Sequence, residues 1–383
     1  MSYGKCIAAL FLMLATVLVT GCWDRVELND VGVLLVTAID KDEKTNQFKA
    51  QTMFAVPRSG NNNSSGPKVK MSIQSKGDDL DKVRLDLDRQ LSRQFVTTHR
   101  RVFIVSESLA RDGIEGILDQ ISRSPKNRLK TYFVVARNAH ASKLINMEYE
   151  LDPTPGEVFR EIVKTKVQVP TSLREIFISS ITPGIEPVAA GFTNKTEENA
   201  KAALDSIALF KGFKLVGFVD DLEAVALNSM LNKKPFGIVE LMEEKGKVLV
   251  ALDTLKVKPD VSLVNNVPQF LCHVKATAHI NENQTPMDVT NPQYIEKLNK
   301  ELEQELEQVY KSLFYKLQRK YEVDSAGLGA VIYRKDPDYW KRIEKNWPSM
   351  YRELPIQWQL KADIAGVGSS GANLFIQENE LIK

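Results

Sequence analysis

The chain has 383 residues, of which 43% are hydrophobic and 26% charged, and a formal net charge of +2. These proportions are typical of a globular protein with real cores, and the length suggests two or three domains. A charge so near zero provides no basic field, which argues against nucleic acid as a partner.

The first element is a short apolar segment behind a single basic residue. Lys5 precedes an apolar run over 7–19, which is shorter than the about 20 residues of a membrane-spanning helix. The length of the run and the small residues that close it are typical of an export signal. We therefore expect residues 1–21 to be a signal peptide that is removed from the mature chain.

A cysteine follows this segment directly. The order aliphatic, small, glycine, cysteine occurs at Val19, Thr20, Gly21 and Cys22. This order resembles the lipobox of bacterial lipoproteins. The resemblance implies S-diacylglycerol transfer to Cys22, cleavage after Gly21 and N-acylation of the new N-terminus. Two or three acyl chains hold a protein on a membrane, whereas one chain alone binds only marginally. The alternatives are an uncleaved anchor helix and a cysteine placed here by chance.

The other cysteines leave no disulfide in the mature chain. Cys6 is removed with the signal and Cys22 is lipidated, so Cys272 has no partner. An exported protein without a disulfide depends on core burial for its stability.

Residues 22–192 open with three strands and then alternate helices with strands. The run 31–39 is almost continuously apolar and rich in Val, which is typical of a buried strand. This order predicts an N-terminal α+β domain with a mixed sheet covered by helices. The expected strands are 31–39, 48–56, 69–75, 102–105 and 132–136, and the expected helices are 80–91, 114–121, 141–149 and 155–167.

A polar, charged stretch over 193–202 is the expected linker to a small middle domain, residues 200–266. Two short apolar runs around a Lys-Gly-Phe turn indicate a hairpin at its start. The expected elements are strands 206–210 and 214–219, a helix over 221–231, and strands near 236–241 and 247–257.

The C-terminal α+β domain, residues 267–383, opens with the clearest strand pattern in the chain. From Gln269 onward apolar and polar residues alternate, which is typical of a half-buried strand. A last helix near 336–345 and a strand at 356–364 close the domain. The apolar face of the opening strand is expected to hold Cys272, Val274, Ala276, Ala278 and Ile280.

A long helix over about 292–323 is the strongest helix signal. Its apolar residues repeat every three or four positions, with Asn291 as the expected cap and Pro292 as the first residue. We expect this helix to pack on its own sheet; docking of a partner helix is the alternative. The apolar stripe consists of Ile295, Leu298, Leu302, Leu306, Val309, Leu313, Leu317 and Tyr321.

No motif in the chain builds a credible active site. Residues 366–371 match G-x-G-x-x-G by spacing, but only 372–383 remain, too few for the βαβ unit that this fingerprint needs. Residues 65–68 match S-x-x-K within a polar loop, where no pocket lowers the pKa of a lysine. The sequence therefore predicts a non-enzyme without a cofactor.

Neither histidines nor acidic residues form a metal site on their own. His273 and His279 share a strand face but lie six residues apart, about 20 Å at the rise of a strand. The acidic cluster over 78–88 lacks the glycine of an EF-hand loop, so we interpret it as the start and solvent face of a helix. The cluster His99-Arg100-Arg101 is interpreted as a basic surface patch, with helix positioning or anion binding as the alternatives.

Four separated stretches carry a resemblance to a known family. They are 21–30 with Gly32 and 39–41; 99–107 with 110–114 and 123–125; 208–211 with 215–218; and 324–329 followed by Pro337, Trp340 and Trp347. With these stretches the chain resembles the Ger(x)C family, the lipoprotein C subunit of bacterial spore germinant receptors. Ser325-Ala326 departs from the family pattern, which has a bulkier apolar pair there, and leaves the exit of the long helix open.

The resemblance implies an elongated α+β protein of three domains, anchored by lipid on the outer face of the spore inner membrane. Its expected partners are a polytopic A subunit and a B subunit that resembles amino-acid transporters, in a receptor that senses nutrients and triggers germination. The family brings no catalytic residues, so only Cys22 is carried over. Our hypothesis is a scaffold or relay, because tethering raises the effective concentration for integral partners. The alternative is a lipid-anchored solute-binding protein that captures a small nutrient directly.

Overall fold

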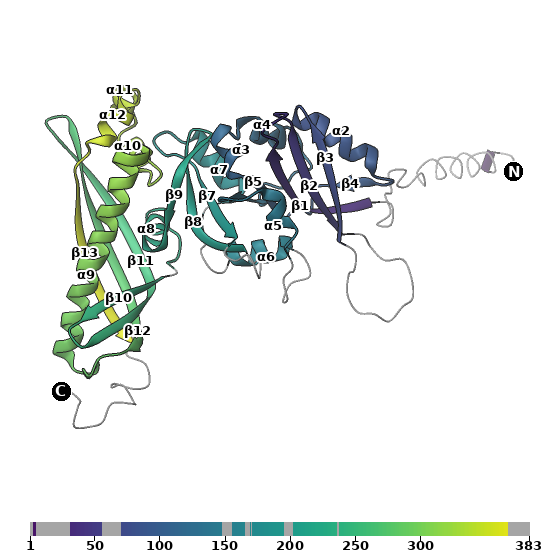
Figure 1. Ribbon diagram of the computed structural model, residues 1–383. Helices are drawn as coiled ribbons and strands as arrows, with labels where there is room; N and C mark the ends of the chain where they lie inside the picture. The colour runs from purple at the N-terminus through teal and green to yellow at the C-terminus, as the bar shows by residue number, and fades with distance from the viewer. Residues whose placement is uncertain are drawn as a thin grey trace.

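The computed structural model describes residues 3–4, 31–55, 70–147, 155–164, 169, 171–194, 202–235 and 237–366. These residues form an elongated molecule with one sheet from the first half of the chain and a second from the later half (Figure 1). Helices pack on both sheets, so the expected α+β class with mixed sheets is confirmed.

The first sheet has nine strands and mixes parallel with antiparallel pairs. The strands are β1 (Val31–Lys41), β2 (Phe48–Ala55), β3 (Lys70–Gly77), β4 (Gln94–Val96), β5 (Val102–Ser106), β6 (Tyr132–Ala136), β7 (Val188–Asn194), β8 (Ala202–Lys211) and β9 (Lys214–Asp220). The first three form an antiparallel meander, and β5, β6 and β7 continue the sheet parallel to β1. Strands β8 and β9 return antiparallel at the far edge, and β4 pairs with β1 off this path.

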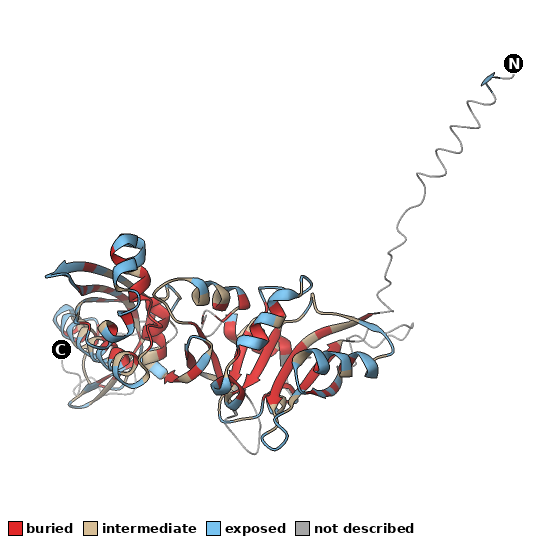
Figure 2. Ribbon diagram, turned by 90° about the horizontal axis from the view of Figure 1, so that it is seen from above, coloured by how far each residue is buried: buried red, intermediate tan, exposed pale blue. Residues whose placement is uncertain are grey.

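Helices cover both faces of the nine-stranded sheet. Strand β5 shows how the faces divide: Phe103 and Val105 pack with one set of helices, and Ile104 packs with the other, because successive side chains of a strand point to opposite faces. The strands are mostly buried while the helices keep exposed outer surfaces (Figure 2). One face carries α2 (Leu80–Gln90), α3 (Glu107–Asp112), α4 (Glu115–Arg123) and α7 (Leu173–Ile181), and the other carries α5 (Ala141–Ile145) and α6 (Pro155–Ile162).

The second sheet contains four strands in the order β10 (Ile238–Glu243), β11 (Gly246–Val264), β12 (Val267–Asn283) and β13 (Ile356–Gly366). The alternation predicted for β12 is confirmed, because its five expected core residues, from Cys272 to Ile280, are all buried. Strands β11 and β12 form one long antiparallel hairpin, and β13 lies parallel to β12.

The long helix packs on this sheet, as expected. It consists of α9 (Pro292–Tyr315) and a π-helical continuation, η3 (Lys316–Tyr321), and the Asn291 side chain caps it by accepting from the Gln293 amide. The stripe is buried at Leu298, Leu302, Leu306, Leu313 and Leu317, whereas Ile295 and Val309 lie at its half-buried border. The helices that follow are α10 (Leu328–Lys335), α11 (Pro337–Ile343) and α12 (Trp347–Arg352).

The strand pairing divides the elements of the expected middle domain between the two sheets. The elements of 200–266 are divided between the sheets: β8 and β9 complete the first, β10 and β11 belong to the second, and α8 (Asp221–Met230) connects them. The expected linker over 193–202 is a connection within one sheet, because Asn194 pairs with Ala202 across antiparallel strands. A polar connection between neighbouring strands resembles a polar linker between domains in sequence, and only the pairing distinguishes them. The outer domain boundaries stay a prediction.

Candidate functional site

The expected lipid anchor cannot be placed in the fold. Val19, Thr20, Gly21 and Cys22 lie outside the described residues, so the lipobox stays a prediction. Residues 65–68 and 367–371 also lie outside them. Within the part of the chain that the structure describes, no helix combines the length and apolar character needed to cross a membrane.

The histidines and the remaining cysteine are dispersed. His279 Nδ1 lies 2.9 Å from Asp253 Oδ1, and among the described residues no group of three His, Cys, Asp or Glu side chains is arranged to hold a metal ion. Cys272 is buried, and its burial raises the pKa of the thiol to about 12. A thiol with so high a pKa stays protonated and unreactive at neutral pH.

The acidic cluster serves helix α2, as the sequence predicts. The Asp79 side chain accepts a hydrogen bond from the Lys82 amide over 2.8 Å and caps the helix. Asp81 lies in the first turn, where negative charge favours the helix dipole. Lys82 Nζ also lies 2.9 Å from Asp78 Oδ2. These contacts place the acidic cluster at the exposed start of helix α2.

The two sheets meet at a joint, which we define as residues 184–187, 217–218 and 321–330 together with α8. The Tyr321 hydroxyl donates to the Phe218 carbonyl oxygen over 3.0 Å. The Glu186 amide donates to the Asp324 carbonyl oxygen over the same distance. Phe218, in one stretch of the family resemblance, therefore contacts Tyr321, three residues before the stretch 324–329, although the two lie far apart in the sequence.

Two glycines allow the backbones to touch at the joint. The Ala330 amide donates to the Gly184 carbonyl oxygen over 2.8 Å. A Cβ atom on Gly329 would lie 2.7 Å from the Gly184 Cα atom, and one on Gly184 would lie 2.3 Å from the carbonyl carbon of Gly329. Gly184 also has a φ of +74°, which residues with a Cβ rarely adopt. Only glycine fits at both positions without a shift of the backbone.

A buried carboxylate holds the same loop together. Asp324 is 5% exposed and accepts hydrogen bonds from the amides of Leu328 and Gly329 over 2.9 and 2.7 Å. It also accepts from the indole nitrogen of Trp347 over 3.1 Å. Burial raises the pKa of this carboxyl to about 7, although its hydrogen-bond donors favour the charged form. Sequence reasoning identified Asp324 only through the family resemblance; its position among small and apolar residues is the one local sign of burial.

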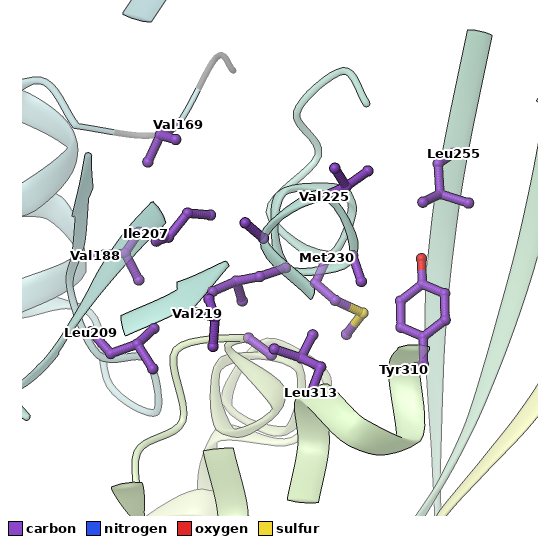
Figure 3. Packing of buried hydrophobic residues seen from close by; sticks show 14 of the residues in the cluster. Val169, Val188, Ile207, Leu209, Val219, Val225, Met230, Leu255, Tyr310 and Leu313 are labelled. Carbon is purple, nitrogen blue, oxygen red and sulfur yellow. The ribbon is translucent and has the colours of Figure 1, made fainter. Parts of the chain in front are cut away.

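The apolar core is continuous across the joint. Figure 3 shows Ile207, Leu209 and Val219 of the first sheet facing Val225 and Met230 of α8, with residues of α9 on the far side. Every residue of α8 from 224 to 230 is buried. A helix buried on all sides is packed between other elements, so α8 connects the two sheets through its side chains as well as through the chain.

Polar contacts add to this packing. Glu223 of α8 accepts from Ser312 over 2.7 Å and pairs with Lys316 over 2.6 Å. The Tyr310 hydroxyl lies 2.7 Å from the Ser229 hydroxyl in the buried interior. The joint therefore has the contacts of a domain core.

The Tyr310–Ser229 contact gives a small, specific prediction. Tyr310→Phe is expected to lower the free energy of unfolding by about 1 kcal/mol, because one buried hydrogen bond is lost while the ring remains. The Ser229 hydroxyl keeps its bond to the Ala226 carbonyl oxygen, which limits the loss. Urea unfolding of this variant and the unmodified protein measures the difference; a loss above about 3 kcal/mol would contradict the assignment.

Comparisons with known proteins give a consistent result over most of the chain. A family model described as "Spore germination protein N-terminal domain" matches residues 24–193, and one described as "Spore germination B3/ GerAC like, C-terminal" matches 205–368. The break between the matches, residues 194–204, covers the connection of β7 to β8 and the first residues of β8, so the second match includes most of β8 and all of β9.

Individual proteins match over nearly their full lengths. Spore germination protein KC of Bacillus subtilis (strain 168) is 25% identical, over 95% of this chain and 96% of its own. Spore germination protein B3 of the same organism is 23% identical, over 94% and 97%. The crystal structure of the GerBC protein matches with a TM-score of 0.59 at 20% identity, covering 86% of this chain and 96% of that chain. A likeness at this identity shows a shared fold.

Proposed function

The chain belongs to the Ger(x)C family of spore germination proteins, and from this membership we propose that it is the lipid-anchored C subunit of a nutrient germinant receptor. In this proposal it lies on the outer face of the spore inner membrane beside integral A and B subunits, which it supports as a scaffold and relay. Its relatives are spore germination proteins, which supports the role in germination.

One observation carries the anchor: Cys22 stands directly after Gly21, at the end of an apolar segment of signal-peptide length. Diacylglycerol on this thiol and an acyl group on the new N-terminus would together hold the chain on the membrane, as a single chain would not. Anchoring concentrates the protein near integral partners without a spanning segment of its own.

The joint supports the relay. A surface that contacts one subunit can report to a distant surface only if the elements between them move as one body or switch between discrete packings. The continuous core through α8 meets this requirement. A flexible connection between two independent domains would not.

The anchor is tested by Cys22→Ala in spores. We expect the variant either to keep its signal peptide as a larger, unprocessed precursor or to fall at least about tenfold in the inner-membrane fraction, because no acyl chain can be attached at this position. Immunoblots of membrane and soluble fractions measure the distribution, and nutrient-triggered germination is scored in the same spores. Germination should fall with the membrane-bound amount.

Cys272→Ala is the matched control, since it removes a buried cysteine that the anchor does not use. It should stay in the membrane fraction, with a stability loss of about 1 kcal/mol from the missing sulfur atom. Normal germination by Cys22→Ala spores would refute the proposed role of the anchor.

A further inference from the structure

The first sheet contains a polar cavity beneath α2 that the proposed function does not use. It has a volume of about 700 Å³, which lies in the range of small-molecule sites. Strands β1, β2, β3 and β5 form its floor, and α2, α4 and the loop after α4 form its walls. The cavity divides the apolar core on this face into two clusters, one around Phe103 and Ile121 and one around Leu34 and Leu87.

Polar atoms without partners gather in this cavity. Buried side-chain atoms normally have a hydrogen-bond partner, because an unmet donor or acceptor costs about 1–3 kcal/mol in the interior. Thr37 and Ser75 are only 7% and 3% exposed, yet their hydroxyls have none in the described part of the protein. The buried atoms that line the cavity without a hydrogen-bond partner are Thr37 Oγ1, Ser75 Oγ, Thr97 Oγ1, Arg100 Nε and Asn127 Oδ1.

Arg100 gives the cavity a positive charge. Its guanidinium carbon lies 5.3 Å from the centre of the Phe103 ring, a cation–π contact, and its Nε atom is buried without an acceptor. No carboxylate within the described residues forms an ion pair with it. Burial lowers the pKa of Arg100 to about 10, so the side chain is still charged at neutral pH. Arg100 as a whole is half-buried, and a cation partly withdrawn from water without a counter-ion gains from a ligand that pairs with it.

The nearby acids are already engaged. Asp81 accepts from the Gln120 side chain over 2.9 Å, and Asp88 lies 3.9 Å from Arg84. Asp119 beside the cavity wall pairs with Arg123 over 2.8 Å. The wall carries four basic side chains against two acidic ones, Arg84, Arg100, Arg123 and Lys126 against Asp81 and Asp88. Arg84 and Arg123 are paired with Asp88 and Asp119, so an incoming ligand meets Arg100 and Lys126, for which the described residues offer no ion pair.

We propose that this cavity binds a small organic carboxylate that also carries a hydroxyl or amino group. The carboxylate would accept hydrogen bonds from Arg100, and the hydroxyl or amino group would donate to Asn127 Oδ1 and exchange hydrogen bonds with the Thr37 and Ser75 hydroxyls. The apolar part would lie on Leu34 and the neighbouring core residues. The site lies within one unit of the fold, so it requires no cleft between lobes.

The test uses the full-length chain in detergent and titration calorimetry with three probes: L-lactate, L-phenyllactate and L-phenylalanine. We expect at least one to bind with a dissociation constant below about 1 mM. L-Phenyllactamide, which has the same shape as L-phenyllactate without the charge, should bind at least about tenfold more weakly than that acid. Absence of binding by all three acids at 10 mM, which is the result expected for a cavity that holds only water, would overturn the proposal.

Variants locate the binding. Arg100→Met should weaken the probe about 10- to 100-fold, and Thr37→Val, which removes one hydroxyl with little change of shape, about 3- to 10-fold. Arg93→Met is the matched control, because Arg93 is exposed and does not line the cavity. Equal affinity of Arg100→Met and the control for the probe would place the ligand outside this cavity and overturn the proposal.

A folding defect is distinguished by thermal unfolding without ligand. Replacing an unpaired buried cation with an apolar side chain of similar length is neutral or stabilising, so Arg100→Met should melt at the same temperature or higher. A fall in melting temperature would contradict an unpaired buried charge at this position. Binding in detergent is independent of the lipid anchor, so its failure would leave the test of Cys22 untouched.

Discussion

Replacing Asp324 with alanine is expected to lower the free energy of unfolding by about 3–5 kcal/mol. The substitution leaves the Leu328 and Gly329 amides and the Trp347 indole buried without an acceptor. Such a loss lowers the melting temperature by about 5 °C in a protein of this size. Thermal and urea unfolding of the full-length chain in detergent measure it.

Asp336→Ala is the matched control. The Asp336 side chain also accepts a backbone hydrogen bond at a helix start, from the Tyr339 amide over 2.8 Å, but it is exposed to solvent. The loss of an exposed helix cap costs about 1 kcal/mol. Equal effects of the two alanine variants would show that burial of Asp324 adds nothing to the cost.

The same carboxyl predicts a pH dependence. Its pKa is about 7 in the folded chain against 3.8 for an ordinary aspartate. Between about pH 4 and pH 7 the folded state therefore binds more protons than the unfolded state, and stability falls as pH rises through this window. The difference between the two pKa values corresponds to at most about 4 kcal/mol in the free energy of unfolding. This contribution is fully present below about pH 4 and lost above about pH 7.

Asp324→Asn isolates the contribution of this titration to stability, because the amide has no proton to release. Its NH₂ group must face an N–H donor in either orientation, so the variant is expected to be about 2–3 kcal/mol less stable than the unmodified protein at pH 5. This difference in stability between the two proteins should narrow toward pH 8, because only the unmodified protein loses the contribution of Asp324 as the pH rises. Urea unfolding at intervals from pH 5 to pH 8 tests this, and a gap that stays constant would mean that Asp324 does not titrate there.

Gly329→Ala is the second large effect. The new methyl group would lie 2.7 Å from the Gly184 Cα atom and 2.8 Å from both the Trp340 ring and the Trp347 nitrogen. These neighbours are a backbone and two buried indoles, none of which yields easily. We expect a loss of about 3 kcal/mol, since overpacking of this kind exceeds the helix preference for alanine.

Gly116→Ala provides the comparison, because a Cβ atom there meets nothing within 4 Å. Gly116 lies in helix α4, so Gly116→Ala should raise the free energy of unfolding by up to about 1 kcal/mol. Spores with each variant connect stability to the relay. At equal amounts in the membrane, Gly329→Ala spores should germinate more slowly and Gly116→Ala spores normally. If Gly329→Ala is shown to lose stability and its spores still germinate normally, the proposed role of the joint in the relay would be contradicted.

Local patterns determined much of the fold. The alternation along β12 and the repeat of α9 are set by which residues must leave water in a strand of period two or a helix of period 3.6, so both could be predicted from the sequence. The helix cap at Asn291 and the acidic start of α2 are likewise local. Strand β7 escaped prediction, because its small apolar residues and Gly191 become a strand only between β6 and β8.

The sequence by itself determined the family resemblance and the periodic elements, and it is the basis for expecting an export signal and a lipobox, since each depends on residues close together in the chain. Only the tertiary structure decided that β8 and β9 complete the first sheet, because strand pairing joins distant segments. It also decided that Asp324 is buried at the joint and that Arg100 faces a cavity of unpaired polar atoms. Burial and charge compensation depend on what other segments bring to a residue, and adjacent sequence does not contain that information.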